Sequence, residues 1–182
     1  MRPALQRALL LLSLTLPVPA EAAESPPEPD GYRMDDYNAP TPRTLAGAAV
    51  LDTAEAERLW REGSAIFVDV MPRAERPANL PPGTLWRDKR RESIPGSTWL
   101  PNVGYGALSE DKERYFRRSL DEITGGIVTR RLVFYCEAEC WMSWNAAKRA
   151  LAFGYANVAW YPEGTNGWSE AGLPLAEVTP RP

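Results

Sequence analysis

The sequence predicts an α/β fold in which a mainly parallel central sheet carries helices on both faces. Short apolar runs alternate along the chain with segments of helical period, and this order is typical of parallel sheets. The runs at 65–70 and 132–135 are apolar almost throughout, as in strands that are covered on both faces. The length that remains after a predicted leader suits one domain, which we place at residues 48–182.

Residues 1–22 have the composition of a secretory signal peptide. Arg2 and Arg7 accompany the apolar run Ala8–Leu16, and small residues follow near Ala20. The run is too short to span a membrane, so we expect a protein that is exported to the periplasm and is not membrane-spanning. Residues 23–47 are rich in proline; we expect a linker without fixed structure up to Asp30, followed by an ordered or half-ordered arm.

The first half of the domain contains two predicted strands and one predicted helix. Residues 48–51 are a short apolar strand candidate. Asp52 and Glu55 form a capping-box pattern that begins a helix through Trp60. The second strand is 65–70, and the proline- and glycine-rich stretch 71–86 that follows is predicted to be a long loop.

The second half repeats this alternation. The predicted elements are a turn at 94–97, a strand at 98–100, a helix from Ser109 to about Ile123, a strand at 132–135, a helix at 144–153 with Ser143 as N-cap, a strand at 157–161 and a short helix around Trp168. Glycines end the three predicted helices, at 125–126, 154 and 172.

The chemically distinctive stretch is the loop between the strand at 132–135 and the helix that follows. It holds Cys136 and Cys140, which are the only cysteines of the chain. At the start of a helix, free N–H groups and the helix dipole favour a thiolate, a persulfide or a bound oxyanion. The chain has no histidine, which excludes cysteine–histidine catalysis and histidine-ligated metal sites.

The charge pattern argues against a nucleic-acid partner. The net charge is −3, with acidic and basic residues mixed along the chain. The one basic cluster, residues 87–91, lies between proline- and glycine-rich segments, and we interpret it as a solvated loop, with an anion or partner site as the alternative.

Four stretches together resemble the rhodanese-like family. They are FVDV at 67–70, IPGSTWLPN at 94–102, the strand that enters the cysteine loop, and EGTNGWSEAGLPL at 163–175. More narrowly, CEAECWMSWNAAKRA resembles the exported rhodanese-like proteins that carry a cysteine–cysteine–tryptophan (CXXCW) motif and are associated with pyrroloquinoline-quinone (PQQ)-dependent alcohol catabolism. The resemblance implies a three-layer domain in which Cys136 accepts a sulfane sulfur and loop amides stabilise the persulfide.

The sequence departs from the family pattern around this loop. No arginine or lysine lies between Cys136 and Ser143, and the loop is one residue longer than in typical sulfurtransferases. Lengthened loops occur in related phosphatases, but those need a loop arginine, so the phosphatase interpretation fails. Met71 stands where an arginine normally follows Asp-Val, and Ser93 stands where histidine is usual. We also expect Glu137 and Glu139 to raise the thiol pKa and to repel thiosulfate.

The candidate site is therefore the cysteine loop and one supporting carboxylate. We assign Cys136 as nucleophile and Cys140 as resolving thiol, and we expect a disulfide between them in an oxidising compartment. The loop positions that would contact substrate are Glu137, Ala138, Glu139, Trp141, Met142 and Ser143. Asp69, at the end of a neighbouring strand, would support the loop.

Three functions remain open from the sequence. The pair could carry sulfane sulfur between a small donor and acceptor. It could act as a thiol–disulfide or maturation factor for a periplasmic quinone-dependent dehydrogenase or a cytochrome c system. It could also be a structural disulfide in a binding module, with Trp141 and Trp144 as a contact surface. Two cysteines with Met142 offer ligands for Cu(I), but with no histidine and with oxidation competing, we expect no metal and no cofactor.

Overall fold

The computed structural model describes residues 25–74, 76–77, 79–87 and 89–182, so the predicted signal peptide lies outside the described residues. Its centre is a five-stranded sheet in the order β1-β6-β5-β2-β4, and every neighbouring pair is parallel. The predicted α/β class with a mainly parallel sheet is confirmed. Among the described residues, no helix is long and apolar enough to cross a membrane.

The strands of this sheet agree with the predicted runs, with somewhat shorter bounds. They are β1 (Ala49–Val50), β2 (Ile66–Asp69), β4 (Thr98–Trp99), β5 (Leu132–Tyr135) and β6 (Val158–Tyr161). The central strand β5 pairs with β2 on one side and β6 on the other, and all four of its residues are buried. The carboxyl ends of these parallel strands meet at one edge of the sheet, which is where the cysteine loop begins.

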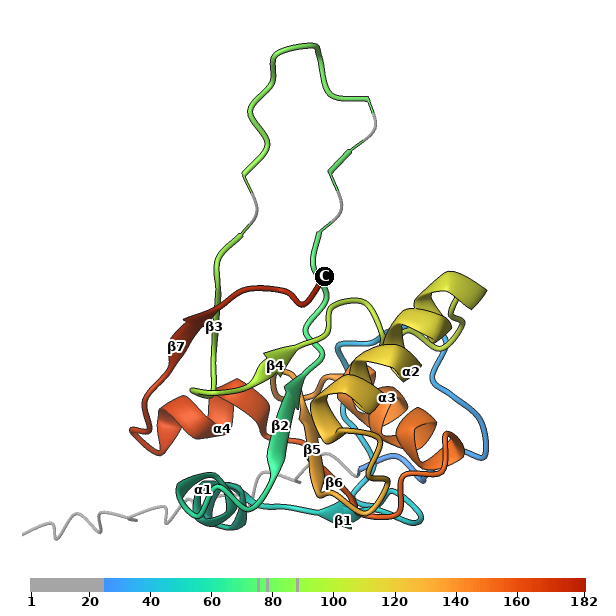
Figure 1. The fold of residues 1–182 in the computed structure, drawn as a ribbon, viewed down its shortest axis with the longest axis vertical. Coiled ribbons are helices and arrows are strands. Elements are labelled where there is room, and N and C mark those ends of the chain that lie inside the picture. Colours follow the sequence, from blue (N-terminus) through green and yellow to red (C-terminus); the bar gives the residue numbers. More distant parts are fainter. Residues whose placement is uncertain (1–24, 75, 78, 88) are drawn as a thin grey trace, which may run out of the picture.

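Helices cover both faces of the sheet, which gives three layers (Figure 1). They are α1 (Thr53–Arg61), α2 (Glu110–Thr124), α3 (Trp141–Ala152) and α4 (Gly164–Glu170). Side chains alternate along β5: Leu132 and Phe134 join the core under α2 and α3, whereas Val133 and Tyr135 join the core with α1 and α4. The four apolar residues of β5 therefore contribute to two separate hydrophobic cores, one on each face of the sheet.

The helix ends of α1 and α2 follow the predicted capping chemistry. The side chain of Asp52 accepts a hydrogen bond from the N–H of Glu55, and Glu55 accepts one from the N–H of Asp52. Ser109 caps α2 in the same manner, and Gly125 ends that helix with φ of 65°. These two predictions are confirmed.

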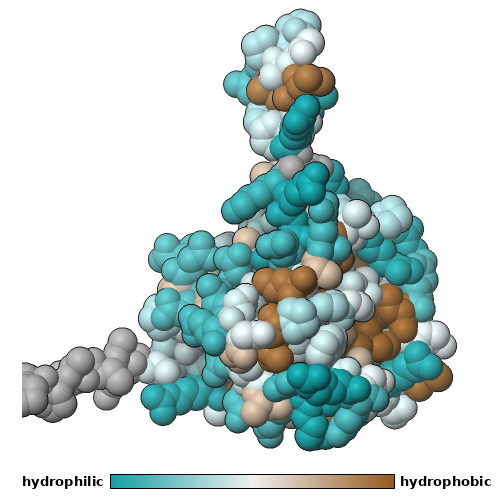
Figure 2. All heavy atoms as spheres, turned by 90° about the vertical axis from the view of Figure 1, so that its left-hand side faces the viewer, coloured by the Kyte–Doolittle hydropathy of each residue, from teal (hydrophilic) through white to brown (hydrophobic). Residues whose placement is uncertain are grey.

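A small second sheet was not predicted. Strand β3 (Arg91–Ser93) pairs antiparallel with β7 (Ala176–Val178). The described parts of the 70–90 connection project away from the body as a long loop (Figure 1), and apolar side chains are visible on it in Figure 2. Leu85 in this loop is 84% exposed. The two strands hold the base of the loop against the domain.

The arm at 25–47 lies along the domain, although almost none of it is regular secondary structure. Even its first part, which we expected to be a linker without fixed structure, makes contacts: the Glu28 carboxylate accepts hydrogen bonds from the N–H of Ala46 and the hydroxyl of Thr44, and Lys148 donates to the carbonyl of Pro29. Specific polar contacts thus hold a segment whose composition alone suggested no structure.

Candidate functional site

The cysteine loop joins the carboxyl end of β5 to the start of α3. Cys136 follows the last residue of β5, and Cys140 is the N-cap of α3. The predicted N-cap, Ser143, is wrong, because the helix begins three residues earlier, at Trp141. The Ser143 hydroxyl donates to the carbonyl of Cys140 (2.8 Å) and accepts from the Trp160 indole (2.9 Å), so it ties the first turn to β6 instead of capping it.

Both cysteines are free thiols, and each influences the ionisation of the other. A hydrogen bond between the two sulfurs is the largest cause that raises the pKa of Cys136 and lowers the pKa of Cys140. Burial adds to the rise at Cys136, whereas N–H groups of Met142, Glu137 and Ser143 help to lower the pKa of Cys140. When the pair loses a proton, these shifts favour the negative charge on Cys140, at the start of the helix.

The carboxylates act differently from the expectation for Glu137 and Glu139. The carboxylate whose charge adds to the raised pKa of Cys136 is the buried Asp69, and the N–H of Glu137 acts the other way and lowers that pKa. Glu137 forms an ion pair with Arg91 (3.2 Å). Glu139 is exposed, has φ of 54° and accepts a hydrogen bond at its carbonyl from the N–H of Ala39. The loop carboxylates are thus turned away from the thiols or neutralised.

Arg91 supplies the cation that the loop lacks. Its side chain is only 10% exposed, and its Nε donates to Asp69 Oδ2 at 2.8 Å. The same guanidinium donates to Glu137 and to the carbonyl of Cys136. The basic cluster at 87–91 is therefore not simply a solvated loop, because its last member is a buried part of the site.

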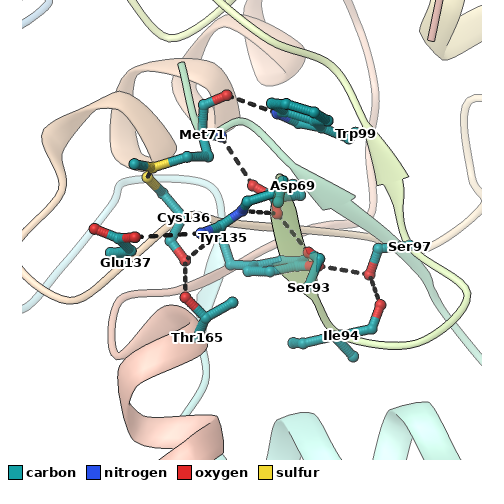
Figure 3. Close-up of polar contacts among 11 residues, drawn as sticks. Asp69, Met71, Ser93, Ile94, Ser97, Trp99, Tyr135, Cys136, Glu137 and Thr165 are labelled. Atoms are coloured by element: carbon teal, nitrogen blue, oxygen red, sulfur yellow. Dashed lines mark hydrogen bonds and ion pairs between the residues drawn. The ribbon is translucent and has the colours of Figure 1, made fainter. Parts of the chain in front are cut away.

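Asp69 is the centre of a buried polar network (Figure 3). Besides Arg91, it accepts hydrogen bonds from the N–H of Met71 and from the hydroxyl of Ser93, and Ser93 in turn contacts the Tyr135 hydroxyl. Burial raises the pKa of Asp69, and Arg91 opposes that shift without cancelling it. The predicted supporting carboxylate thus lies in contact with the elements that flank the cysteine loop.

Met71 separates Cys136 from a cavity of about 490 Å³. Its Sδ lies 3.4 Å from Cys136 Sγ, and its side chain is half-buried. The cavity is lined by Met71, Arg91 and Glu137, with Lys89 and Arg90 from the base of the protruding loop and Thr165 and Asn166 from α4. Cys136 itself is fully buried, so a ligand in this cavity reaches the thiol only when Met71 moves.

On the other side, the arm covers Cys140. Asn38 forms an isolated antiparallel bridge with Cys140, and the carbonyl of Tyr37 accepts from the N–H of Trp141 at 2.9 Å. Cys140 is 5% exposed as a result. The arm thus completes the first turn of α3 with main-chain hydrogen bonds and closes the site on this side.

The remaining predicted loop residues have structural surroundings. The N–H of Ala138 donates to the Asn166 side chain. Trp141 and Trp144 are buried and pack edge to face at 5.5 Å, so they form no exposed contact surface. Met142 is buried against the main chain at Gly104, where an added Cβ would lie 2.5 Å from the Met142 Cβ. Met142 contributes to the site through its N–H group, which lowers the pKa of Cys140.

Sequence reasoning missed three parts of the site: Arg91, Met71 and the arm at 37–39. The signal for Arg91 was indirect, since replacing the usual arginine after Asp-Val by Met71 left the Asp69 carboxylate in need of another cation. No sequence pattern marked the arm. Among the described residues, no group of three His, Cys, Asp or Glu side chains is placed to hold a metal.

Comparison with known proteins gives a family and a fold. Residues 52–171 match the rhodanese-like domain family. No curated protein matches the chain. Among solved structures, a thiosulfate sulfurtransferase from Pseudomonas aeruginosa matches with 20% identity and a TM-score of 0.50, over 74% of this chain and 21% of that one.

Two further structures match with lower scores. An EanB variant in complex with hercynine has 23% identity and a TM-score of 0.49, over 81% of this chain and 35% of that one. A protein of unknown function from Rhodopseudomonas palustris, described as a possible tyrosine phosphatase, has 21% identity and a TM-score of 0.48, over 72% and 86%. The chain thus spans about a fifth of the sulfurtransferase and a third of EanB, and these matches concern the fold alone.

Proposed function

The chain belongs to the rhodanese-like domain family, and on that premise we propose that it is an exported protein whose Cys136–Cys140 pair acts in sulfane-sulfur transfer or thiol redox chemistry. The single observation that carries this proposal is the position of Cys140 as N-cap of α3 in the same short loop as Cys136, where its interaction with Cys136 and the N–H groups of the loop lower its pKa. In a chain without histidine, it gives the nucleophile a proton acceptor of its own.

The proposed loading step uses Cys140 as base and Cys136 as nucleophile. The thiolate of Cys140 takes the proton of Cys136 while Cys136 Sγ forms a bond to the sulfane sulfur of the donor. The bond between that sulfur and the rest of the donor breaks, and the leaving group departs with the electron pair; from thiosulfate it is sulfite. Cys136 then carries a persulfide and Cys140 a thiol, with no net oxidation.

Two fates of the persulfide are chemically balanced. An acceptor thiolate can attack the outer sulfur and leave with it, and Cys136 then recovers its proton from Cys140. Alternatively, Cys140, as thiolate, attacks the inner sulfur, which forms the Cys136–Cys140 disulfide and releases hydrosulfide. In the second route the two thiols are oxidised and the sulfane sulfur is reduced. An external reductant of the dithiol class would restore the pair.

The cavity beside Met71 is the proposed donor side. Among the described residues, four basic ones line it, Arg73, Lys89, Arg90 and Arg91, against three acidic ones, Glu92, Glu137 and Glu170. An anionic sulfur donor would therefore find cations near its entry, and the shift of Met71 would open the way to Cys136.

The direct test is the intact mass of the reduced protein after exposure to inorganic polysulfide. We expect one added sulfur on the wild type, none on Cys136→Ala, and on Cys140→Ala a slower addition that persists because the resolving thiol is absent. Loading of Cys136→Ala equal to wild type would overturn the assignment of the nucleophile.

A second candidate is a non-catalytic module, and the burial of both thiols favours it. It predicts that the folded wild type takes up no sulfur at saturating polysulfide, and that its thiols react only after unfolding. The same mass measurement, made under native conditions and in denaturant, separates the two candidates.

We further propose periplasmic location and a link to PQQ-dependent alcohol catabolism, through a quinone-dependent dehydrogenase or a cytochrome c system. The supports are the composition of residues 1–22 and the cysteine–tryptophan motif of the loop. Cell fractionation tests the location. For the link, we expect a deletion strain to grow poorly on an alcohol as sole carbon source, and Cys136→Ala to fail to restore growth; normal growth of the deletion strain would contradict it.

A further inference from the structure

Three sulfur atoms from two separate parts of the chain meet at the carboxyl edge of the sheet. Met71 follows β2 by two residues, and Cys136 and Cys140 flank the loop between β5 and α3. Cys136 interacts with both of the others: its Sγ donates to Met71 Sδ at 3.4 Å, and Cys140 is the largest cause of its raised pKa. The sulfur contact of Met71 and Cys136 is visible in Figure 3.

One proton cannot satisfy this arrangement. The Cys136 thiol has a single hydrogen, which it donates to the thioether of Met71, and Cys140 is the second sulfur with which it interacts. When the proton lies toward one acceptor, the other sulfur has only a van der Waals contact. A cation that accepts two or three sulfur ligands would bond to all of them at once.

The surroundings select a soft, singly charged cation. Thiolate and thioether sulfur prefer Cu(I) to harder ions. No histidine is available, and the nearest carboxylates are engaged: Asp69 and Glu137 both pair with Arg91. The three sulfurs also lie in one apolar cluster, because Cys136 and Cys140 belong to the core under α3 and Met71 packs against it. Such a site excludes water and the oxygen ligands that Zn(II) or Mg²⁺ would bring.

The charge of a bound ion would be balanced locally. Two thiolates and one Cu(I) carry a net charge of −1. The N–H groups of Met142 and Ser143 at the start of α3 and the guanidinium of Arg91, which donates to the carbonyl of Cys136, lie beside that charge.

Met71 also provides a path of entry. It is half-buried and lines the 490 Å³ cavity, whereas both cysteines are buried and neither lines it. An ion that arrives in the cavity meets the thioether first and the thiolates second.

We propose that Met71, Cys136 and Cys140 form a three-sulfur site for Cu(I), with Met71 as the ligand that faces the cavity. Binding forms bonds from the ion to two thiolates and one thioether and releases to solvent whichever thiol protons remain. Copper stays in the +1 state, and no sulfur is oxidised. The site uses the same cysteines as the proposed sulfur chemistry but does not depend on it.

The test is anaerobic titration of the reduced full chain with Cu(I) against a chromophoric Cu(I) chelator, followed by X-ray absorption of the loaded protein. We expect one Cu(I) per chain and a first shell of three sulfurs. Met71→Leu should weaken binding at least tenfold and leave two sulfurs. Met142→Leu is the matched control: the spacing of the loop alone would favour Met142 as a ligand, and we expect its affinity to stay within threefold of wild type.

The outcomes are decisive in both directions. Equal affinity of Met71→Leu and wild type, a shell of two sulfurs in the wild type, or nitrogen and oxygen neighbours would overturn the proposal. Native mass spectrometry with Ag(I), which does not change oxidation state here, repeats the stoichiometry without redox chemistry. Polysulfide loading is measured without metal, so a failure of copper binding leaves the sulfur-transfer test intact, and the reverse also holds.

Discussion

At the scale of single residues, the main question is which group accepts the proton of the nucleophilic thiol in a site without histidine. A nucleophilic thiol needs a partner that accepts its proton, and in a chain without histidine a second thiol, that of Cys140, can take that role. The second thiol lies where helix N–H groups stabilise its charge, whereas the first is buried against β5 and Met71. The two thiols therefore ionise as a coupled pair, and their titration belongs to both.

Removing Cys136 should change the ionisation of Cys140 in a known direction. The hydrogen bond from Cys136 is the largest cause of the lowered pKa of Cys140. In Cys136→Ala we expect the pKa of the remaining thiol to rise above that of the first ionisation in wild type. Thiolate absorbance in the ultraviolet, followed against pH, measures both. In the reciprocal variant Cys140→Ala, the remaining Cys136 should ionise above an ordinary thiol because of burial; the opposite order of the two variants would contradict this account.

Arg91 should matter as much for stability as for the site. It pairs with a carboxylate that is completely buried, and a methionine at this position would leave Asp69 without a cation. Breaking a buried pair at one end costs about 3–5 kcal/mol. We therefore expect the free energy of unfolding of Arg91→Met, measured by urea denaturation, to be lower than that of wild type by about 3–5 kcal/mol.

A double variant separates charge from packing. In Asp69→Asn/Arg91→Met the uncompensated charge is gone, so we expect part of the stability to return. If the double variant is less stable than Arg91→Met alone, the ion pair is not the cause of the loss.

The residues of the site were only partly predictable. Asp69 ends β2, and Cys136 and Cys140 lie in the loop after β5, so the pattern of a parallel sheet was enough to bring them to one edge. Arg91 and Met71 could not be placed, because their roles depend on how the 70–90 connection returns to the domain. That return is fixed by the pairing of β3 with β7, strands too short to leave a period in the sequence.

At the scale of elements, the arm and α3 act as one unit. Asn145 on α3 joins them: its Oδ1 accepts from the N–H of Arg33, and its Nδ2 donates to the carbonyls of Arg33 and Gly104, each at 2.9 Å. This clamp holds the arm where Asn38 pairs with Cys140. Access to Cys140 from this side therefore requires the arm to leave α3.

Cutting the clamp should expose Cys140. Asn145→Ala leaves main-chain groups of the arm and of Gly104 without their partners, at a cost of about 1–3 kcal/mol. We expect faster labelling of Cys140 by a thiol reagent under native conditions and faster hydrogen exchange at residues 33–39. Lys148→Ala is the control, since Lys148 holds the arm at Pro29, outside the stretch that pairs with the cysteine loop. Equal labelling rates in the two variants would show that the clamp does not govern access.

The error at the start of α3 shows what sequence patterns omit. Ser143 is a good N-cap by residue type, and Cys140 makes no side-chain capping bond at all. The helix nevertheless starts at Trp141, because the carbonyl of Tyr37 accepts the N–H of Trp141 and Ser143 is bound to Trp160. Tertiary contacts with the arm and with β6 override the local preference here, whereas Asp52 and Ser109 cap as predicted.

At the scale of the whole molecule, the two cores are closed by tyrosines whose hydroxyls lie at their borders. The Tyr155 hydroxyl donates to Asp121 of α2 at 2.8 Å, and the Tyr161 hydroxyl at the end of β6 lies 2.7 Å from the Thr53 hydroxyl of α1. Burial, as the largest cause, raises the pKa of each to about 12. These phenols keep their protons in the folded protein where an unfolded chain, with a tyrosine pKa of about 10, has lost them.

Because of this difference, the free energy of unfolding depends on pH, and the direction of the dependence can be predicted. Between about pH 10 and 12 the folded state binds more protons than the unfolded state, so the free energy of unfolding falls as the pH rises, by at most about 1.4 kcal/mol per pH unit for each tyrosine. Below about pH 10 the contribution is fully present. We expect urea denaturation of Tyr155→Phe to show a shallower decline over this range than wild type. Because wild type and variant share the same two cysteines, the difference in slope isolates the phenol, and identical slopes would mean that Tyr155 ionises alike in both states.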